Sequence, residues 1–522
     1  MCILAPTQQI ASAYAVHLGR HGDVQRLARR RGVGRQRLYR EAAAALAALD
    51  GAAHRRQAEA LRQRVRDLEA RAADLEARLA RAVVLDADKQ AEFAAVGQAE
   101  GVSLPDLHTL LDVLLPGRAP SVATLGRWTQ AAGARAGALL AVLDDEAGPR
   151  AKQAVLDELY VRRPVLMAVE PDSLCWLSGR LLEALSGDAW ADELDRLPRL
   201  EQVVRDGGSC LGKGVAEANR RRRRRGQGAV ADQLDHFHLL REGGRGLGRA
   251  ERAAHRAQVA LAKAEADRAR RQWRGLTAVG ASNRLRALRA QAEQALATWV
   301  ERDAAWQRAK AAVQPFTPEG DLNTRARAEA ELAEALPRLP DADFATVKGL
   351  LQRPQALTYL DEVQRKLEAL EVPAAVREAA VQAEGLRRRP ERLRGEGPAA
   401  AALRGVLLAC AVVLAKAGEA GTRAVEGVRA ALRSSWRASS LVECVNGVVR
   451  MQQARHRKLS QGLLDLKRLY WNSQPFRTGR RKGQSPYQRL GVAWPEGVRW
   501  WEVLQWSPER LRQELSAPNK AA

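Results

Sequence analysis

The sequence predicts a mostly helical α+β protein in which one small sheet lies among long helices. Three short apolar segments, at residues 155–161, 165–169 and 174–177, are separated by brief polar connections and predict three successive strands. Residues 242–433 instead carry helical periodicity with paired Glu and Arg side chains, which predicts a large helical insertion. At 522 residues the chain has room for about three or four domains, and its 46% of hydrophobic residues suffices to build their cores.

Residues 23–41 have the spacing of a helix-turn-helix. Ala28 packs on the first helix, Gly32 permits the turn and Leu38 anchors the second helix. The second helix then presents side chains able to reach phosphates or base edges in a DNA major groove: Arg35, Gln36, Arg37 and Arg40. An ordinary helical hairpin with a solvated basic face is the alternative.

A heptad seam follows in residues 52–84, which contain no glycine or proline. Its apolar residues alternate in steps of four and three, at Leu61, Val65, Leu68, Ala72, Leu75, Leu79 and Ala82. Such a seam pairs two protomers or folds back on its own chain, and we favour pairing. Residues 101–144 predict a second helical module, with Ser121 as a helix cap, which is a weaker helix-turn-helix or a plain connector.

The first strand carries two carboxylates, Asp157 and Glu158, in an otherwise apolar run. An unpaired ion in an apolar setting is strongly disfavoured, so such a strand needs a metal, a cationic partner or a solvated end. Neighbouring strand residues point to opposite faces, so the two carboxylates are not expected to serve one site. A fourth strand, at residues 200–205, ends at Asp206, and two glycines follow, which is where open α/β sheets place ligands.

Six consecutive arginines come next, and they are expected to be solvated or to hold DNA phosphates: Arg220, Arg221, Arg222, Arg223, Arg224 and Arg225. A fifth strand is expected to carry Asp235-His236-Phe237-His238, one of whose histidines could touch the site. Too few histidines lie nearby for a zinc cluster.

The segment 434–450 predicts a helix that carries a third carboxylate, Glu443. Ser440 would cap this helix with Glu443 three residues on, as in a capping box, and apolar residues follow at helical spacing. Taken alone, Glu443 could be only the capping carboxylate.

Together these segments resemble a DDE-type transposase of a bacterial insertion sequence. The resemblance rests on the strand with Asp157, the strand ending at Asp206, the DHFH segment at 235–238 and SSWRASSLVE with Glu443. The C-terminal NSQPFRTGRRKGQSPYQRLG is similar to the ends of many such transposases. The resemblance runs from the N-terminal helix-turn-helix to about Gly491 and is weakest within the helical insertion.

The resemblance implies a ribonuclease-H-like mixed sheet and metal-dependent cleavage and strand transfer of double-stranded DNA, at the ends of a mobile element and at its target. Asp157, Asp206 and Glu443 would be both the catalytic and the metal-binding residues, with two Mg²⁺ or Mn²⁺ ions per site. Asp157 would bridge both ions, and the other two residues would each complete one. Because transposition joins two ends of one element, a homodimer or higher assembly would have a purpose.

Further basic or polar side chains near this site are expected to contact DNA. They are Asn446, Arg450, Arg457 and Lys458 on or after the Glu443 helix, and Arg480, Arg481 and Lys482 in a loop. Four C-terminal tryptophans, at 494, 500, 501 and 506, predict a tail packed on the catalytic domain.

The net charge of +24 and a pI near 10.7 are expected of a polyanion-binding protein, although a biased genome could also produce them. Five scattered cysteines without a CxxC suit a reducing cytoplasm and argue against structural zinc. The N-terminus lacks a signal-peptide pattern, and the apolar run 405–415 is too short to span a bilayer, which predicts a buried helix. We therefore expect a DNA-associated protein of the bacterial cytoplasm with no membrane partner.

The expected domains are a helix-turn-helix domain (1–50), a coiled-coil helix (51–90), a second helical module with linker (91–150), the first part of the catalytic core (151–241), a helical insertion (242–433), the second part of the core (434–491) and a C-terminal tail (492–522). Two other functions stay open. One is a catalytically inactive DNA-binding protein derived from a transposase, and the other is a metal-dependent nuclease on the same fold.

Overall fold

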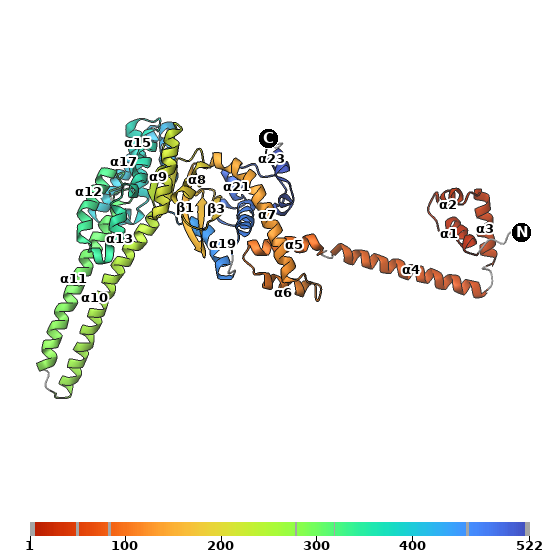
Figure 1. The fold of residues 1–522 in the computed structure, drawn as a ribbon, viewed down its shortest axis with the longest axis horizontal. Helices are drawn as coiled ribbons and strands as arrows, with labels where there is room; N and C mark the ends of the chain where they lie inside the picture. Colours follow the sequence, from red (N-terminus) through yellow and green to blue (C-terminus); the bar gives the residue numbers. More distant parts are fainter. Residues whose placement is uncertain are drawn as a thin grey trace. The chain divides into compact units, whose positions relative to one another are not determined.

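The computed structural model describes residues 6–48, 52–81, 85–276, 279–317, 319–455 and 459–516. The chain divides into two compact units, Met1–Lys89 and Gln90–Ala522. As the sequence predicts, helices dominate, and the described residues form a single five-stranded mixed sheet (Figure 1).

The first unit contains three helices, two of which cover the segment predicted as a helix-turn-helix. Its helices are α1 (Pro6–His17), α2 (Asp23–Arg31) and α3 (Arg35–Ala48). Gly32 ends α2 with φ 63°, and its N–H bonds the Ala28 and Arg29 carbonyls, so the residue that permits the turn adopts the left-handed backbone that glycine favours. Leu38 is fully buried beneath the turn.

The predicted coiled-coil segment is one continuous helix, α4 (Ala52–Arg81). Its large apolar seam residues are all exposed, between 49% and 68%, at Leu61, Val65, Leu68, Leu75 and Leu79. Within the described residues of the first unit the seam is therefore left uncovered; Ala82 lies outside the described residues.

The sheet of the second unit has the order β3-β2-β1-β4-β5. β1 pairs antiparallel with β2, and β2 with β3, whereas β1 and β4, and β4 and β5, are parallel. The strands are β1 (Gln153–Val161), β2 (Arg163–Val169), β3 (Trp176–Leu181), β4 (Gln202–Arg205) and β5 (Ala231–Leu234). The expected fifth strand at Asp235–His238 is wrong, because β5 ends at Leu234 and Asp235 caps the following helix.

Helices cover both faces of this sheet. On one face Val155 and Leu159 of β1 pack against α19 (Val442–Arg455), which we call the α19 face. On the opposite face Leu156 packs in a core shared with α7 and α9. The helices outside the insertion are α5 (Ala87–Ala99), α6 (Leu104–Leu114), α7 (Val122–Ala147), α8 (Gly187–Asp195), α9 (Ser209–Arg224), α20 (Gln461–Ser473), α21 (Pro486–Leu490), α22 (Trp500–Leu504) and α23 (Pro508–Ser516).

Two details at the ends of this unit bear on the sequence predictions. Ser121 caps α7 as expected, accepting from the Thr124 N–H at 3.2 Å. The C-terminal tryptophans pack on the core opposite the α19 face, with Trp500 and Trp501 buried.

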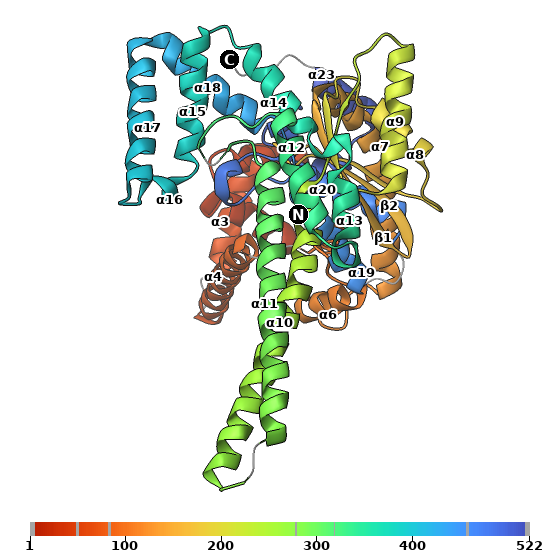
Figure 2. The same ribbon diagram turned by 90° about the vertical axis from the view of Figure 1, so that its left-hand side faces the viewer.

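The insertion is helical, as predicted, and has its own core around Trp306, Phe344 and Tyr359 (Figure 2). Its helices are α10 (His236–Trp273), α11 (Val279–Ala312), α12 (Arg325–Ala335), α13 (Asp341–Leu351), α14 (Thr358–Glu368), α15 (Ala374–Arg387), α16 (Pro390–Leu393), α17 (Pro398–Lys416) and α18 (Glu419–Arg433). It starts at His236, immediately after β5.

The prediction that the apolar run 405–415 forms a buried helix is wrong. The run lies in α17, which is long and apolar enough to cross a membrane by length and composition alone, yet only 11% of it is buried. The helix packs on α15 and α18 and buries Ala400 and Cys410, whereas Leu408, Val412 and Val413 stay exposed.

Candidate active site

The register of the sheet brings two of the predicted carboxylates together. Leu156 of β1 lies opposite Arg205 of β4 in the parallel pair, so Asp157 and Asp206 occupy the next position on two neighbouring strands. Alternation places Asp157 on the same side as Val155 and Leu159, which is the α19 face. The two aspartates therefore meet at one edge of the parallel part of the sheet.

Helix α19 brings the third carboxylate to the same face. Val442, Val445 and Val449 are fully buried against β1 and β2, and Glu443 follows the first of them. The helix begins at Val442, so the expected cap at Ser440 is wrong. Arg450 lies two helical turns further along α19, and its Nη1 is 2.5 Å from Oε2 of Glu443.

The negative charges of Asp206 and Glu443 affect the pKa of Asp157. Burial raises the pKa of Asp157, and the negative charges of Asp206 and Glu443 raise it further, against hydrogen bonds from the Glu158 N–H and from Asn446 that lower it. Repulsion of this kind requires the charges to be close. A cation in their midst would remove the repulsion.

Asn446 is fully buried and orients Asp157. Its Nδ2 donates to Asp157 Oδ2 at 2.5 Å, while its Oδ1 has no hydrogen-bond partner. A buried acceptor without a partner costs about 1–3 kcal/mol, so it needs a donor or a cation supplied from outside the chain. The side chain has no exposed surface for the DNA contact predicted for it.

The donors fit Mg²⁺ or Mn²⁺ in chemistry, because they are carboxylates with an amide oxygen beside them. They are not assembled as a ligand set: in the described part of the chain no three acidic, histidine or cysteine side chains are already arranged to hold a metal ion. Glu443 is engaged with Arg450, so it would exchange this arginine for the ion.

Asp206 is held through both its side-chain carboxylate and its backbone carbonyl. The Gly208 N–H donates to Asp206 Oδ1 at 2.8 Å, and Arg205 Nη1 donates to the Asp206 carbonyl at 2.9 Å. Arg205 is itself buried and held by two bonds of 2.8 Å to Asp232. A Cβ on Gly208 would stand 2.8 Å from Asp206 Oδ1, so a larger residue here would displace the carboxylate.

Glu158 points to the opposite face, as expected from alternation, and accepts from Trp190 Nε1 at 2.9 Å. Burial raises its pKa, and the charges of Asp206 and Asp157 add to that effect. It is thus a fourth carboxylate near the edge of the site.

Sequence reasoning allowed one histidine of this segment to touch the site but missed the role of Asp235 as a helix cap. Asp235 is the N-cap of α10 and accepts from the N–H groups of Phe237 and Ser439 at 2.8 and 2.9 Å and from the imidazole of His238. Its hydrogen bond to Asp235 raises the pKa of His238, and the charges of Asp157 and Asp206 contribute. His238 therefore lies beside the aspartates, and the signal available in the sequence was an Asp N-cap directly after a strand.

The arginine run forms the end of α9 and its C-cap, and four of its six members bond to other residues of the chain. Arg222 is buried and donates to the carbonyls of Gly228, Leu197 and Leu200. Arg221 pairs with Asp192 and Asp195 at 2.9 Å, Arg225 pairs with Asp195, and Arg220 pairs with Glu217. Arg223 and Arg224 are fully exposed members of the run.

The other residues predicted to contact DNA are mostly on the surface. Arg35, Gln36, Arg37 and Arg40 are exposed on α3. Arg480 and Lys482 are exposed in the C-terminal loop, whereas Arg481 donates to the carbonyls of Pro171 and Asp172. Arg457 and Lys458 lie outside the described residues.

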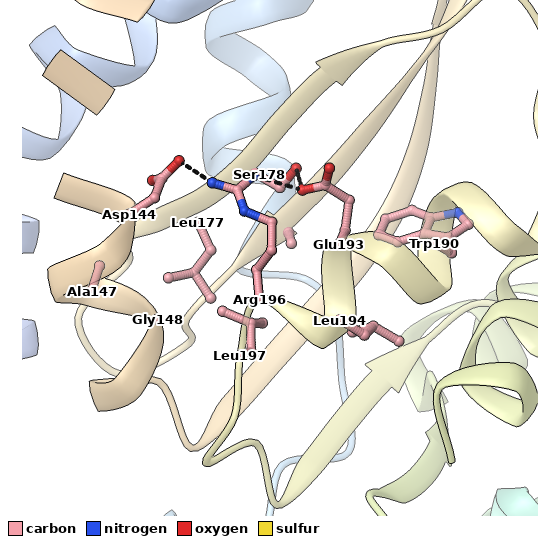
Figure 3. A pocket seen from close by; sticks show the side chains of 11 residues that line it. Asp144, Ala147, Gly148, Leu177, Ser178, Trp190, Glu193, Leu194, Arg196 and Leu197 are labelled. Atoms are coloured by element: carbon pink, nitrogen blue, oxygen red, sulfur yellow. Dashed lines mark hydrogen bonds and ion pairs between the residues drawn. The ribbon is translucent and has the colours of Figure 1, made fainter. Parts of the chain in front are cut away.

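A small pocket on the opposite face of the sheet belongs to the scaffold. Figure 3 shows Asp144 of α7 paired with Arg196, and Glu193 of α8 accepting from Ser178 at 2.6 Å. Asp144 pairs with Arg196 and Arg468, and Glu193 pairs with Arg180 and Arg196, so both carboxylates already have partners within the chain.

Comparisons of the chain with models of protein families, with curated proteins and with solved structures found no match. The geometry of the α19 face is therefore the ground for any statement about function.

Proposed function

We propose that this protein is a DDE-type transposase, which cleaves DNA at the ends of a mobile element and transfers the resulting strands to a target. The observation that carries the proposal is the meeting of Asp157, Asp206 and Glu443. These residues lie far apart in the sequence, yet two of the charges raise the pKa of the third.

The arrangement of strands supports a ribonuclease-H-like core. Three antiparallel strands, β1 to β3, continue into the parallel strands β4 and β5, and helices cover both faces. Asp157 lies in the middle of β1, and Asp206 directly follows β4. The large insertion begins only after β5, so it does not interrupt the sheet.

Asp157, Asp206 and Glu443 would hold two Mg²⁺ or Mn²⁺ ions. Such ions polarise the scissile phosphate and stabilise the leaving oxygen when they are bound. Asn446 keeps one oxygen of Asp157 in place through its amide. Arg450 neutralises Glu443 in the absence of a metal and becomes available to a DNA phosphate when Glu443 turns away.

The nucleic-acid partner is supported by charge and exposure. The net charge is +24, and exposed arginines lie on α3, at the end of α9 and in the C-terminal loop. The uncovered heptad seam of α4 supports pairing of two copies through a coiled coil, which would bring two element ends together.

The test is a reaction of the purified full-length protein with DNA carrying the sequences that flank its gene, in Mg²⁺, in Mn²⁺ and in EDTA. We expect metal-dependent cut and joined products from the wild type. Asp157→Asn should reduce them by at least about 10³-fold while leaving DNA binding unchanged. The matched control is Glu419→Gln at an exposed position of α18, which should react like the wild type.

Each result of this assay has a distinct meaning. Cuts without joined products would identify a metal-dependent nuclease. A mobility shift without cuts would identify an inactive DNA-binding protein. Full activity of Asp157→Asn would show that the carboxylates of the α19 face are not the catalytic centre.

A further inference from the structure

In the described part of the chain, the far end of the α10–α11 hairpin packs only within the hairpin, where Leu285 of α11 is buried. The two helices run antiparallel and are long, and Figures 1 and 2 show them extending beyond the other helices of the insertion. No residue of α10 after Ala254 is buried. The tip is therefore supported only by the hairpin itself.

An exposed tryptophan stands at this tip. Trp273, the last residue of α10, is 88% exposed, more than any other large hydrophobic residue of the described chain, and Leu276 is 56% exposed. An indole usually buries most of its 150–250 Å² and gives its N–H a partner. An exposed one with no neighbour to pack on is suited to an external surface.

The tryptophan is surrounded by positive charge. Residues 268–276 read RARRQWRGL, with four arginines and no acidic residue. Arg270 pairs with Asp267 at 2.6 Å, whereas Arg271 and Arg274, which flank Trp273, are exposed. A second copy of this chain, with its charge of +24, would meet this rim with like charge, but a polyanion would be attracted to it.

We propose that the hairpin tip binds DNA, with Trp273 stacking on an unpaired or unstacked base while Arg271 and Arg274 hold the neighbouring phosphates. This inference rests on the proposed function and adds to it a contact far from the carboxylates. Stacking on an aromatic side chain needs a base that is free of its helix, as at a mismatch, a bulge or a broken end. The tip thus distinguishes opened from intact duplex DNA.

The experiment measures binding of the full-length protein to two duplexes of equal length in EDTA, so that no chemistry occurs. One duplex is fully paired, and the other has a single unpaired 2-aminopurine, whose fluorescence reports stacking. We expect wild type to bind the second duplex more tightly and to quench its fluorescence. Trp273→Ala should lose about tenfold in affinity for this duplex, lose the quenching and bind the paired duplex as the wild type does.

Matched variants separate stacking from charge. Trp273→Phe should retain most of the preference and the quenching. Changing both Arg271 and Arg274 to Gln should weaken binding to both duplexes and lower the slope of log affinity against log salt by about two. Val300→Ala, at a residue of the same hairpin that is 52% exposed, should bind like the wild type.

Three results would overturn the inference. Equal affinity and quenching in wild type and Trp273→Ala would do so while leaving the transposase proposal intact. Binding of anionic lipid vesicles that depends on Trp273, without any preference for the unpaired base, would assign the tip to membranes. A wild type that neither binds nor cuts DNA would end both proposals together.

Discussion

The two faces of the sheet differ in whether their charged side chains have partners of opposite charge. On the face opposite α19, Arg468 lies buried with Nη2 2.6 Å from Asp144 and Nη1 2.6 Å from the Leu177 carbonyl. Glu193 is likewise buried and accepts from Ser178 while pairing with Arg180. Asp144, Glu193 and Arg468 thus each have a partner of opposite sign on another element.

The α19 face is instead left with an excess of negative charge. Asp157 and Asp206 repel each other, and Asn446 keeps a buried oxygen without a partner. A satisfied network stabilises a scaffold, whereas an unsatisfied one costs stability and survives only where a ligand completes it. The difference between the faces therefore separates residues that hold the fold from residues that serve a reaction.

Removing a partner from the satisfied face should have the largest effect on stability. Arg468→Met leaves Asp144 and the Leu177 carbonyl short of a donor in a buried setting. We expect a loss of about 3–5 kcal/mol in the free energy of unfolding of the catalytic unit, measured by urea denaturation. Arg499→Met removes an arginine that is 54% exposed from its pairs with Glu92 and Glu502, and it should cost less than about 1 kcal/mol. Equal losses would show that burial does not set the difference.

One buried cation on the satisfied face lacks a carboxylate in contact and should make stability depend on pH. Lys467 Nζ donates to the Ala99 carbonyl at 2.6 Å, and burial lowers its pKa to about 8, although Glu100 opposes that shift. The unfolded state binds more protons between pH 8 and the ordinary value of 10.5, so stability should rise with pH across this window.

The gain attributable to Lys467 should be roughly 3 kcal/mol, since one pKa unit corresponds to about 1.4 kcal/mol. The measurement is the difference in unfolding free energy between wild type and Lys467→Met at pH 7.5 and pH 10. The subtraction removes the contributions of tyrosines that titrate in the same range. A difference that stays constant with pH would show that the lysine is not desolvated.

On the α19 face, neutralising a carboxylate should stabilise the fold. Asp157→Asn keeps an acceptor for Asn446 and removes the repulsion from Asp206 and Glu443. We expect a gain of about 1 kcal/mol at neutral pH in metal-free buffer. Because the folded pKa of Asp157 is raised, its contribution to stability is present below the unfolded value near 3.8 and is lost as pH rises through the folded pKa.

The stability difference between wild type and Asp157→Asn should therefore be small at pH 3.5 and grow toward pH 7. Added Mn²⁺ should reverse the order by stabilising only the wild type. A variant that is less stable than wild type at neutral pH without metal would mean that Asp157 has a cationic partner inside the chain.

The strands with clear apolar runs were predictable, and those with polar residues were not. β1 and β2 match the predicted segments within two residues at each end, because apolar residues fill most of both strands and only Asp157 and Glu158 interrupt β1. β3 extends to Leu181, beyond the predicted end at residue 177, since Ser178 and Arg180 hid it. β5 was displaced onto Asp235, whose role as a helix cap depends on contacts with Ser439 far along the chain.

The sequence placed Asp157 on a strand, Asp206 after a strand and Glu443 on a later helix, and the structure has them on those elements. The ion pairs of the arginine run could not be predicted, because Asp192 and Asp195 belong to α8 and no local sequence pattern links them to Arg221. The exposure of α17 was equally hidden, because an apolar run does not reveal whether neighbours cover one side or all sides.

The smallest effect on stability should come from the one ion pair that links the α19 face to solvent. Arg450 and Glu443 are 50% and 30% exposed, so Arg450→Gln should change the free energy of unfolding by less than about 0.5 kcal/mol. Its effect should appear in ligand binding instead. Because Glu443 is then free of the arginine, the site should bind Mn²⁺ several-fold more tightly, while its affinity for DNA falls. Electron paramagnetic resonance of the free Mn²⁺ measures the metal affinity.

The control for Arg450 is Arg365→Gln, which breaks a comparable exposed pair with Glu362 on α14 and should alter neither Mn²⁺ nor DNA binding. If Arg450→Gln leaves Mn²⁺ affinity unchanged, Glu443 does not reach the ion, and the α19 face would hold a two-aspartate site. If it weakens Mn²⁺ binding, the arginine supports the metal site rather than competing with it. If Arg450→Gln raises the affinity for Mn²⁺ and lowers the affinity for DNA, Arg450 exchanges the Glu443 carboxylate for a DNA phosphate when the metal is bound.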